Sequence, residues 1–184
     1  MIGLFVFLLL LGGFWLGAAP VSAAPAGFAD DPPLLNLGAG VAQIFDNHQE
    51  FFWNAEYRPA CRFFHCAPWL SFGTGKNDEF YAAVGVLADI ELGRGWVLTP
   101  SFGGGYYDAS SGLDLGFDAE FRTAVELARR LGHGPRLGVS IAHLSNGSLS
   151  DHNPGTEALG ITYSFPLDFL FRRTAPAAAP QPAK

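Results

Sequence analysis

The chain alternates apolar and polar residues over most of its length, with the period of two that is typical of β-strands. In the segment 117–131, for example, Phe121 and Val125 belong to an apolar face, whereas Glu120 and Arg122 belong to a charged face. The same alternation predicts strands over the segments 35–45, 50–58, 67–75, 80–92, 95–107, 117–131, 135–146 and 156–167. The sequence therefore predicts an all-β protein with eight antiparallel strands.

Four features of these segments favour a membrane barrel over a soluble one. Most are close to the nine to eleven residues that a tilted membrane-spanning strand needs, whereas soluble strands average five or six. Their number is even, and their polar faces mix both signs of charge with glycine, as expected inside a narrow barrel. Aromatic residues that could form interfacial girdles lie near segment ends: Trp53, Tyr57, Trp69, Phe80, Trp96, Tyr106, Tyr163 and Phe165.

The expected fold is thus an eight-stranded antiparallel transmembrane β-barrel of the outer membrane. The alternative is a soluble exported barrel, such as a lipocalin-like carrier. Composition agrees with either, because 49% of the residues are hydrophobic and only 15% are charged, against about 25% charged in soluble domains. The net charge of −6 and the scattered Lys and Arg residues leave no basic patch, so nucleic acid is not an expected partner.

The N-terminus indicates export. Residues 4–18 form an apolar run that small residues follow, which predicts a signal peptide over 1–23 with cleavage after Ala23. No Lys or Arg precedes the apolar run, and a retained membrane anchor is the alternative. A single barrel domain over 24–173 and a disordered Ala/Pro tail over 174–184 are expected to follow.

If both chain ends are periplasmic, the connections 46–49, 76–79, 108–116 and 147–155 lie outside the cell. The stretch "CRFFHC" falls on the periplasmic side, in a longer connection than is usual there. In an exported protein Cys61 and Cys66 are expected to close a small loop by a disulfide. A metal site is the alternative, but it would need more ligands than these two thiols and His65.

The segment 135–146 places a hydroxyl and an imidazole in register with apolar side chains. Leu137 and Ile141 share a lipid-facing side with His143 and Ser145, and Glu157 has the outward parity on the next segment. Residues i and i+2 of a strand lie about 7 Å apart, so an imidazole can bridge much of the gap to a hydroxyl. These residues have the chemistry of a hydrolase triad, although solvated residues at a barrel rim would look the same.

Two short stretches carry a family resemblance. His143-Leu144-Ser145-Asn146-Gly147 and Asn153-Pro154-Gly155-Thr156-Glu157 resemble the signature of the lipid A 3-O-deacylase (PagL) family of outer-membrane enzymes. The resemblance implies that Ser145 attacks an ester carbonyl, His143 acts as general base and then acid, and Glu157 orients the imidazole. It also implies that Asn153 helps to hold the oxyanion, with Asn146 and Gly147 beside the nucleophile.

By this resemblance the substrate is lipid A of lipopolysaccharide, the location is the bacterial cell outer membrane, and the chemistry needs no metal or cofactor. One rival is another lipid esterase or phospholipase with the same triad. A second rival is a non-catalytic outer-membrane barrel. Exposed aromatic residues suit lipid or a second copy of the barrel equally, so a homodimer is left open. The tail lacks the terminal aromatic residue that is common in barrel assembly.

Overall fold

The computed structural model describes residues 27–29, 31–45, 49–132 and 134–168. The expected signal peptide over 1–23 and the expected tail over 174–184 lie outside these residues. Within them, no helix combines the length and the apolar composition needed to cross a membrane.

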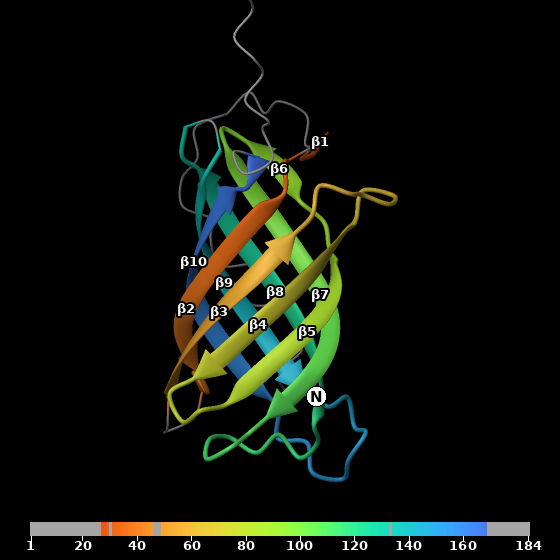
Figure 1. The fold of residues 1–184 in the computed structure, drawn as a ribbon, viewed down its shortest axis with the longest axis vertical. Coiled ribbons are helices and arrows are strands. Elements are labelled where there is room, and N and C mark those ends of the chain that lie inside the picture. The colour runs from red at the N-terminus through yellow and green to blue at the C-terminus, as the bar shows by residue number, and fades with distance from the viewer. Residues whose placement is uncertain (1–26, 30, 46–48, 133, 169–184) are drawn as a thin grey trace, which may run out of the picture.

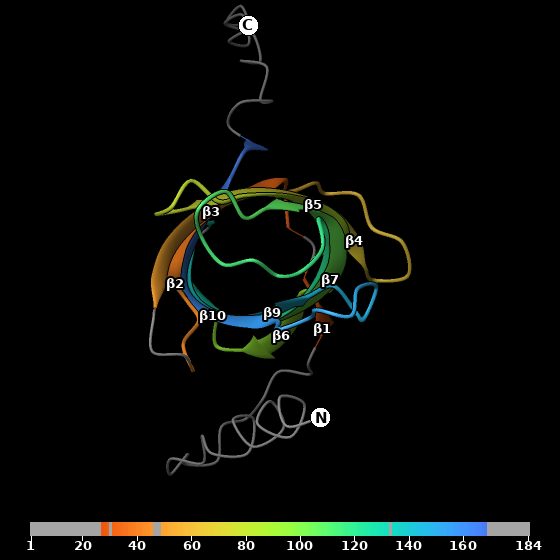
Figure 2. The same ribbon diagram turned by 90° about the horizontal axis from the view of Figure 1, so that it is seen from below.

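Eight long antiparallel strands of the described chain close into a barrel (Figures 1 and 2). They are β2 (Leu34–Ala42), β3 (Glu50–Arg58), β4 (Ala67–Gly75), β5 (Phe80–Leu87), β7 (Trp96–Asp108), β8 (Ala119–Arg130), β9 (Arg136–Ser145) and β10 (Thr156–Pro166). Each pairs with the next along the chain, and β10 pairs with β2 to close the ring. Two short strands, β1 (Gly27–Phe28) and β6 (Ile90–Gly93), extend the wall at one end. The all-β barrel prediction is confirmed.

The expected strand over 80–92 is interrupted. It separates into β5 and β6 because Ala88 and Asp89 leave the ladder opposite Pro100. Pro100 has no N–H to donate, and only the Ala88 N–H bond to its carbonyl remains, at 3.1 Å. The Asp89 side chain turns inward instead and is 2% exposed. A smaller difference is that β8 begins at Ala119, two residues later than the pattern predicts.

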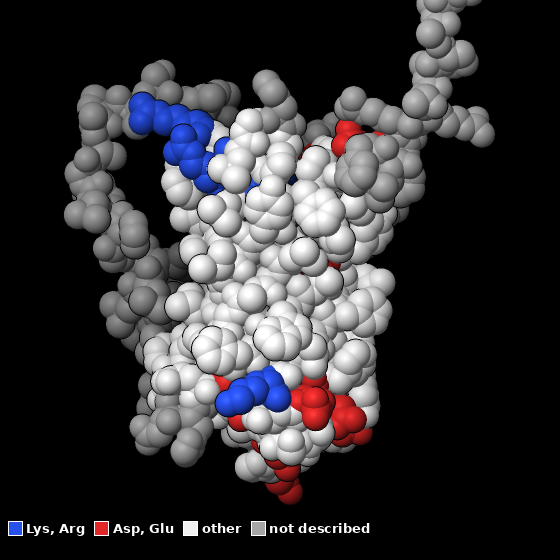
Figure 3. All heavy atoms as spheres, turned by 60° about the vertical axis from the view of Figure 1, so that its left-hand side comes forward, with Lys and Arg blue, Asp and Glu red and all other residues white. Residues whose placement is uncertain are grey.

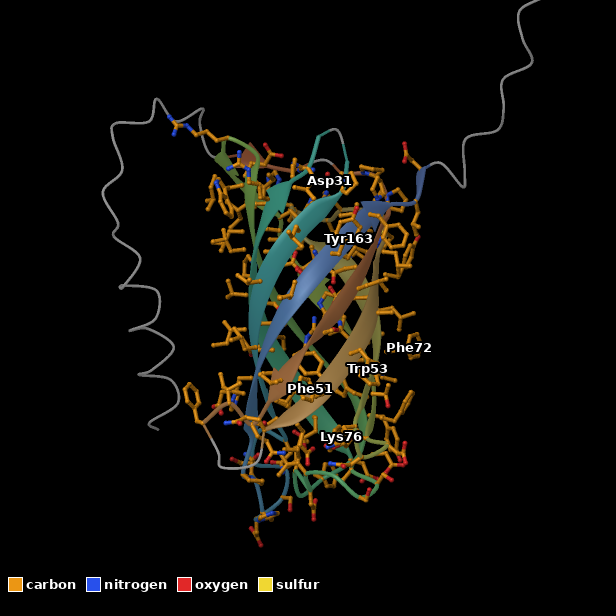
Figure 4. The ribbon with its side chains drawn as sticks, turned by 90° about the vertical axis from the view of Figure 1, so that its left-hand side faces the viewer. Asp31, Phe51, Trp53, Phe72, Lys76 and Tyr163 are labelled. Carbon is orange, nitrogen blue, oxygen red and sulfur yellow. The ribbon has the colours of Figure 1, made fainter. Side chains whose placement is uncertain are left out.

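The outer wall of the barrel is apolar. Outward side chains such as Trp53, Phe72, Val84 and Ile161 are 50–64% exposed, and Figure 4 shows Phe72 pointing away from the barrel. In Figure 3 the middle of the visible face is almost free of charged residues, which gather at the two ends. A charge-free belt around a closed barrel is the arrangement that faces lipid.

Trp69 corrects one prediction. The sequence placed it in an aromatic girdle, but its parity on β4 points inward and it is 2% exposed. The indole needs space that only glycine leaves, because a Cβ at Gly85 or Gly103 would lie about 2.5 Å from Cζ2. The Arg122 guanidinium lies 4.2 Å from the indole centroid on the same inner side, so Trp69 is part of the barrel core.

Charged side chains fill the interior in pairs. Arg58 donates to Glu56 at 2.9 Å and to Glu126 at 3.1 and 3.2 Å. Arg122 donates to the second oxygen of Glu56, and Asn36 donates to Glu126 at 2.7 Å. These groups are removed from bulk water, and pairing offsets the cost of their desolvation. The expected mixture of charges inside a narrow lumen is confirmed.

A second charged cluster closes the upper end of the barrel in Figure 1. Arg136, which is fully buried, donates to both oxygens of Asp89 at 3.2 Å and also to Asp31. Thr99 donates to Asp89 at 2.6 Å. The charge of Arg136 and these hydrogen bonds offset the cost of burying the Asp89 carboxylate. Asp89 therefore holds β7 and β9 together at this end of the barrel.

Glu120 is the exception among the inward carboxylates. It is 1% exposed, and neither oxygen has a hydrogen-bond partner among the described residues. Because an unpaired buried carboxylate is destabilising when ionised, Glu120→Gln is expected to keep or raise the free energy of unfolding. Glu126→Gln, which removes the charge facing Arg58, is expected to lower it by about 2 kcal/mol. Urea unfolding in detergent micelles measures both, and a larger loss for Glu120→Gln would contradict the expectation.

Candidate active site

The candidate residues lie at the lower end of the barrel in Figure 1, where β9 ends and β10 begins. His143 is directly opposite Glu157 in the antiparallel ladder, and Ser145 is opposite Phe121 of β8. His143 and Ser145 share the outward parity of Val139, which is 54% exposed. The structure therefore brings the imidazole and the carboxylate together on the lipid-facing side, as the alternation predicted.

A polar contact on the lipid-facing side joins His143 and Glu157. The imidazole Nδ1 lies 3.2 Å from Glu157 Oε1. An ionised carboxylate only accepts hydrogen bonds, so Nδ1 of a neutral imidazole carries the proton and Nε2 keeps its lone pair. The two side chains are 43% and 27% exposed. The pair is thus oriented by a charge and open to a ligand arriving along the outer wall.

Ser145 is the last residue of β9 and is partly buried. Its hydroxyl makes no hydrogen bond to the imidazole in the part of the chain that the structure describes. Catalytic hydrogen bonds are often long in ligand-free enzymes and tighten when substrate binds. The positions of the two side chains on one strand face keep them within reach of a shared ligand.

A hydrogen bond between Asn146 and Asn153 connects the end of β9 to the loop that follows. The backbone N–H of Asn146 donates to Asn153 Oδ1 at 3.1 Å, and this bond leaves the Asn153 NH₂ group free to donate elsewhere. The Asn146 side chain is fully buried and donates to the carbonyls of Leu115 and His152 at 3.0 and 2.8 Å. Asn146 therefore supports the loop, and its backbone N–H is already used. His152 is itself exposed to solvent.

Gly155 is a site residue that the spacing of polar groups did not reveal. It has a φ of 65°, which favours glycine, and a Cβ there would lie 3.1 Å from His143 Cε1. Glycine thus lets the loop pass close beside the imidazole. Gly147 has a φ of 63°, and a Cβ there would lie 3.1 Å from the Phe121 ring. The Asn-Pro-Gly turn was the available signal for Gly155, because such turns often need a positive φ.

Other site types find less support in the structure. Among the residues outside the undescribed segments, no group of three or more His, Cys, Asp and Glu side chains could hold a metal ion. Cys61 and Cys66 are free, exposed thiols, so the expected disulfide is not formed in this structure. Among the described residues, the outward pairing of His143 with Glu157 is the arrangement that favours a catalytic function.

Comparison with known families gives the decisive observation. The family model described as lipid A 3-O-deacylase (PagL) matches residues 49–166. The chain belongs to this family. No curated protein matches the sequence, so membership rests on the family model, and the structural likeness agrees with it.

Solved structures show the same fold. The crystal structure of the outer membrane enzyme PagL is similar with a TM-score of 0.62 and 13% identity, covering 73% of this chain and 99% of that one. A de novo designed transmembrane β-barrel is similar at 0.53 and 12% identity, covering 73% and 96% of the two chains. The crystal structure of Neisserial surface protein A is similar at 0.53 and 8% identity, covering 76% and 98%. Identities this low show the fold alone.

Membership in the PagL family settles the location and the broad activity. The chain is a bacterial outer-membrane barrel of a family of lipid A deacylases, which are hydrolases acting on esters. Lipid A is the substrate that family membership implies. Which side chains carry out hydrolysis in this chain is a separate question.

Proposed function

We propose that this protein hydrolyses the ester that links an acyl chain to the 3 position of lipid A, using Ser145, His143 and Glu157 on the lipid-facing wall. The observation that carries the proposal is the His143–Glu157 contact of 3.2 Å. On a surface that meets lipid, a polar pair is costly to desolvate, so its presence there needs a functional reason. Family membership supplies the reaction class.

The chemistry follows from the roles of the three groups. Ser145 Oγ attacks the ester carbonyl carbon while its proton passes to His143 Nε2. The bond between the carbonyl carbon and the 3-oxygen of the sugar then breaks, and the imidazolium gives its proton to this departing oxygen. Water attacks the acyl-serine in the same manner, releasing a fatty acid. Glu157 holds the tautomer and stabilises the imidazolium, because its carboxylate faces Nδ1.

Asn153 is the proposed donor to the oxyanion. Its side-chain oxygen is occupied by the N–H of Asn146, the residue after Ser145, so the amide is anchored next to the nucleophile with its NH₂ group available. One such donor contributes about 3 kcal/mol to lowering a barrier of this type. Asn146 and Gly147 are proposed to shape the turn that holds Asn153 and Ser145 together.

Glu157→Gln tests the orienting role. Glutamine keeps the size of the side chain but removes the charge that stabilises the imidazolium, so kcat is expected to fall by roughly 10²-fold. Steady-state hydrolysis of lipid A by purified enzyme in detergent micelles measures kcat. The shift in gel mobility between heated and unheated samples verifies that the variant barrel is folded. Unchanged kcat in a folded variant would remove Glu157 from the mechanism.

The specific reaction is tested by mass spectrometry of lipid A from cells that express the protein. The wild type is expected to remove one 3-hydroxyacyl chain, and cells without it are expected to retain that chain. Unchanged lipid A in the presence of a folded wild-type barrel would contradict the 3-O specificity. Hydrolysis of phospholipid by the same preparation would then favour a phospholipase, whereas no hydrolysis of either lipid would favour a non-catalytic barrel.

A further inference from the structure

The segment 59–66 lies at the end of the barrel opposite Ser145, which is the periplasmic end if both chain ends are periplasmic, and it has no role in the proposed chemistry. It joins β3 to β4 and contains the stretch "CRFFHC". Figures 1 and 2 show it, coloured gold, projecting sideways beyond the barrel wall and level with the strand ends. We call residues 59–66 the aromatic hairpin.

The tip of the aromatic hairpin exposes two large apolar side chains. Phe63 is 72% exposed and Phe64 is 98% exposed, the highest exposure among the large hydrophobic residues of the described chain. No Asp or Glu occurs between Pro59 and Cys66, and the charged groups there are Arg62 and, when protonated, His65. An exposed apolar tip without carboxylates suits a lipid surface better than water.

The hairpin holds a defined shape. Phe63 and Cys66 exchange two backbone hydrogen bonds, at 2.7 and 2.9 Å. The turn residues Phe64 and His65 have φ values of 48° and 72°, a left-handed conformation that Asn and Gly adopt at much lower cost. Residues held in such conformations cluster at functional sites, and here the turn presents a phenylalanine outward.

Two contacts fix the hairpin to the barrel. Arg62 lies 3.5 Å from the buried Asp89 carboxylate. The His65 ring stacks on Phe28 of β1, with centroids 4.1 Å apart and an interplanar angle of 13°. Because both the base and one side of the tip are held, Phe63 and Phe64 keep their outward direction without a ligand.

The wall below the hairpin is also apolar and continuous with the lipid-facing belt. A shallow hollow there is lined by Tyr57, Pro59, Pro68, Leu70, Val84 and Val86. Pro59 belongs to the hairpin itself, so the hairpin and the membrane-facing wall share one surface. The belt faces lipid. Because the surface of the hairpin is continuous with the belt, lipid is the partner that the hairpin surface favours.

We propose that the aromatic hairpin inserts Phe63 and Phe64 among the acyl chains of the periplasmic phospholipid leaflet and anchors the barrel at that depth. The proposal concerns the opposite end of the barrel from Ser145 and does not depend on the catalytic triad. Its failure and the failure of the proposed function are therefore separate results.

Spin labels test the location. Phe64→Cys is labelled in a Cys61→Ala, Cys66→Ala background and reconstituted in vesicles of phosphatidylethanolamine and phosphatidylglycerol. Ile161→Cys, on the outer wall, is the lipid reference, and Asp151→Cys, on an exposed loop, is the water reference. At position 64, the ratio of collisions with oxygen to collisions with a neutral nickel chelate is expected to match the ratio at position 161. It is expected to exceed the ratio at position 151 several-fold. A ratio that matches position 151 would place the tip in water and overturn the proposal.

A second measurement keeps both cysteines. Phe64→Trp adds one indole to an otherwise unchanged chain, and the added fluorescence is read in vesicles with and without brominated acyl chains. Quenching of the added signal by half or more is expected. An added signal that brominated lipid leaves unchanged would overturn the proposal, and it would direct attention to a periplasmic protein as the partner of the hairpin.

Discussion

Ser145→Ala is expected to lower the rate of ester hydrolysis by at least about 10³-fold, because alanine has no oxygen to attack the carbonyl. The remaining rate would come from the oxyanion donor and from substrate positioning. KM should change little, since the hydroxyl contributes small contact area. Single-turnover hydrolysis of lipid A by the purified variant measures the loss directly, and the acyl-enzyme proposed for the wild type should be absent.

A matched control lies on the same strand. Ser140 is also on β9 but lines the interior cavity, so Ser140→Ala is expected to retain wild-type activity within about threefold. The experiment separates a nucleophile from a hydroxyl that helps the barrel fold. Equal activity losses in the two variants, or full activity in Ser145→Ala, would contradict the assignment.

The largest expected loss of stability follows from Arg136→Leu. Arg136 is fully buried between Asp31 and Asp89. Removing the cation leaves Asp89 with the Thr99 hydrogen bond and the longer contact to Arg62, while Asp31 keeps its pair with Arg130. Breaking a buried pair of this kind costs about 3–5 kcal/mol. The free energy of unfolding, from reversible urea titration in micelles followed by tryptophan fluorescence, should fall by that amount.

Two further variants make this prediction specific. Arg129, seven positions earlier on β8, is exposed, with its guanidinium 5.5 Å from the Trp96 ring centroid. Arg129→Leu is expected to change the free energy of unfolding by less than about 1 kcal/mol. Adding Asp89→Asn to Arg136→Leu should recover part of the loss, because it removes one of the uncompensated charges. A double variant less stable than Arg136→Leu alone would contradict the ion-pair explanation.

Much of the fold could be predicted from alternation alone. Each strand has one side toward the barrel interior and one side toward lipid, and a period of two assigns every residue to one of these sides. The alternation therefore predicts the inward sides of β8, β9 and β10 correctly. The outward position of His143 and Glu157 followed from the same parity. Their contact also depends on the register between β9 and β10, which alternation alone does not fix.

The remaining features depend on contacts between distant segments. Trp69 fits inside the barrel because Gly85 and Gly103, on two other strands, leave room for its indole, and the sequence of β4 alone does not show that this room exists. The break between β5 and β6 depends on Pro100, which lies in the opposite strand. Similarly, the loop contact of Gly155 with His143 is visible only in three dimensions.

The His143–Glu157 pair spans only fourteen positions of the chain, and Ser145 and Asn153 lie between its members. One β-hairpin therefore contains the complete set of groups proposed for catalysis, while the other six long strands of the described barrel provide the wall. A site encoded in one contiguous segment can move as a unit. Grafting residues 136–166 onto another eight-stranded barrel of matching register would test whether this hairpin alone carries the proposed activity. If it does, exchange of a single hairpin between genes would spread such an activity among barrels that share little sequence.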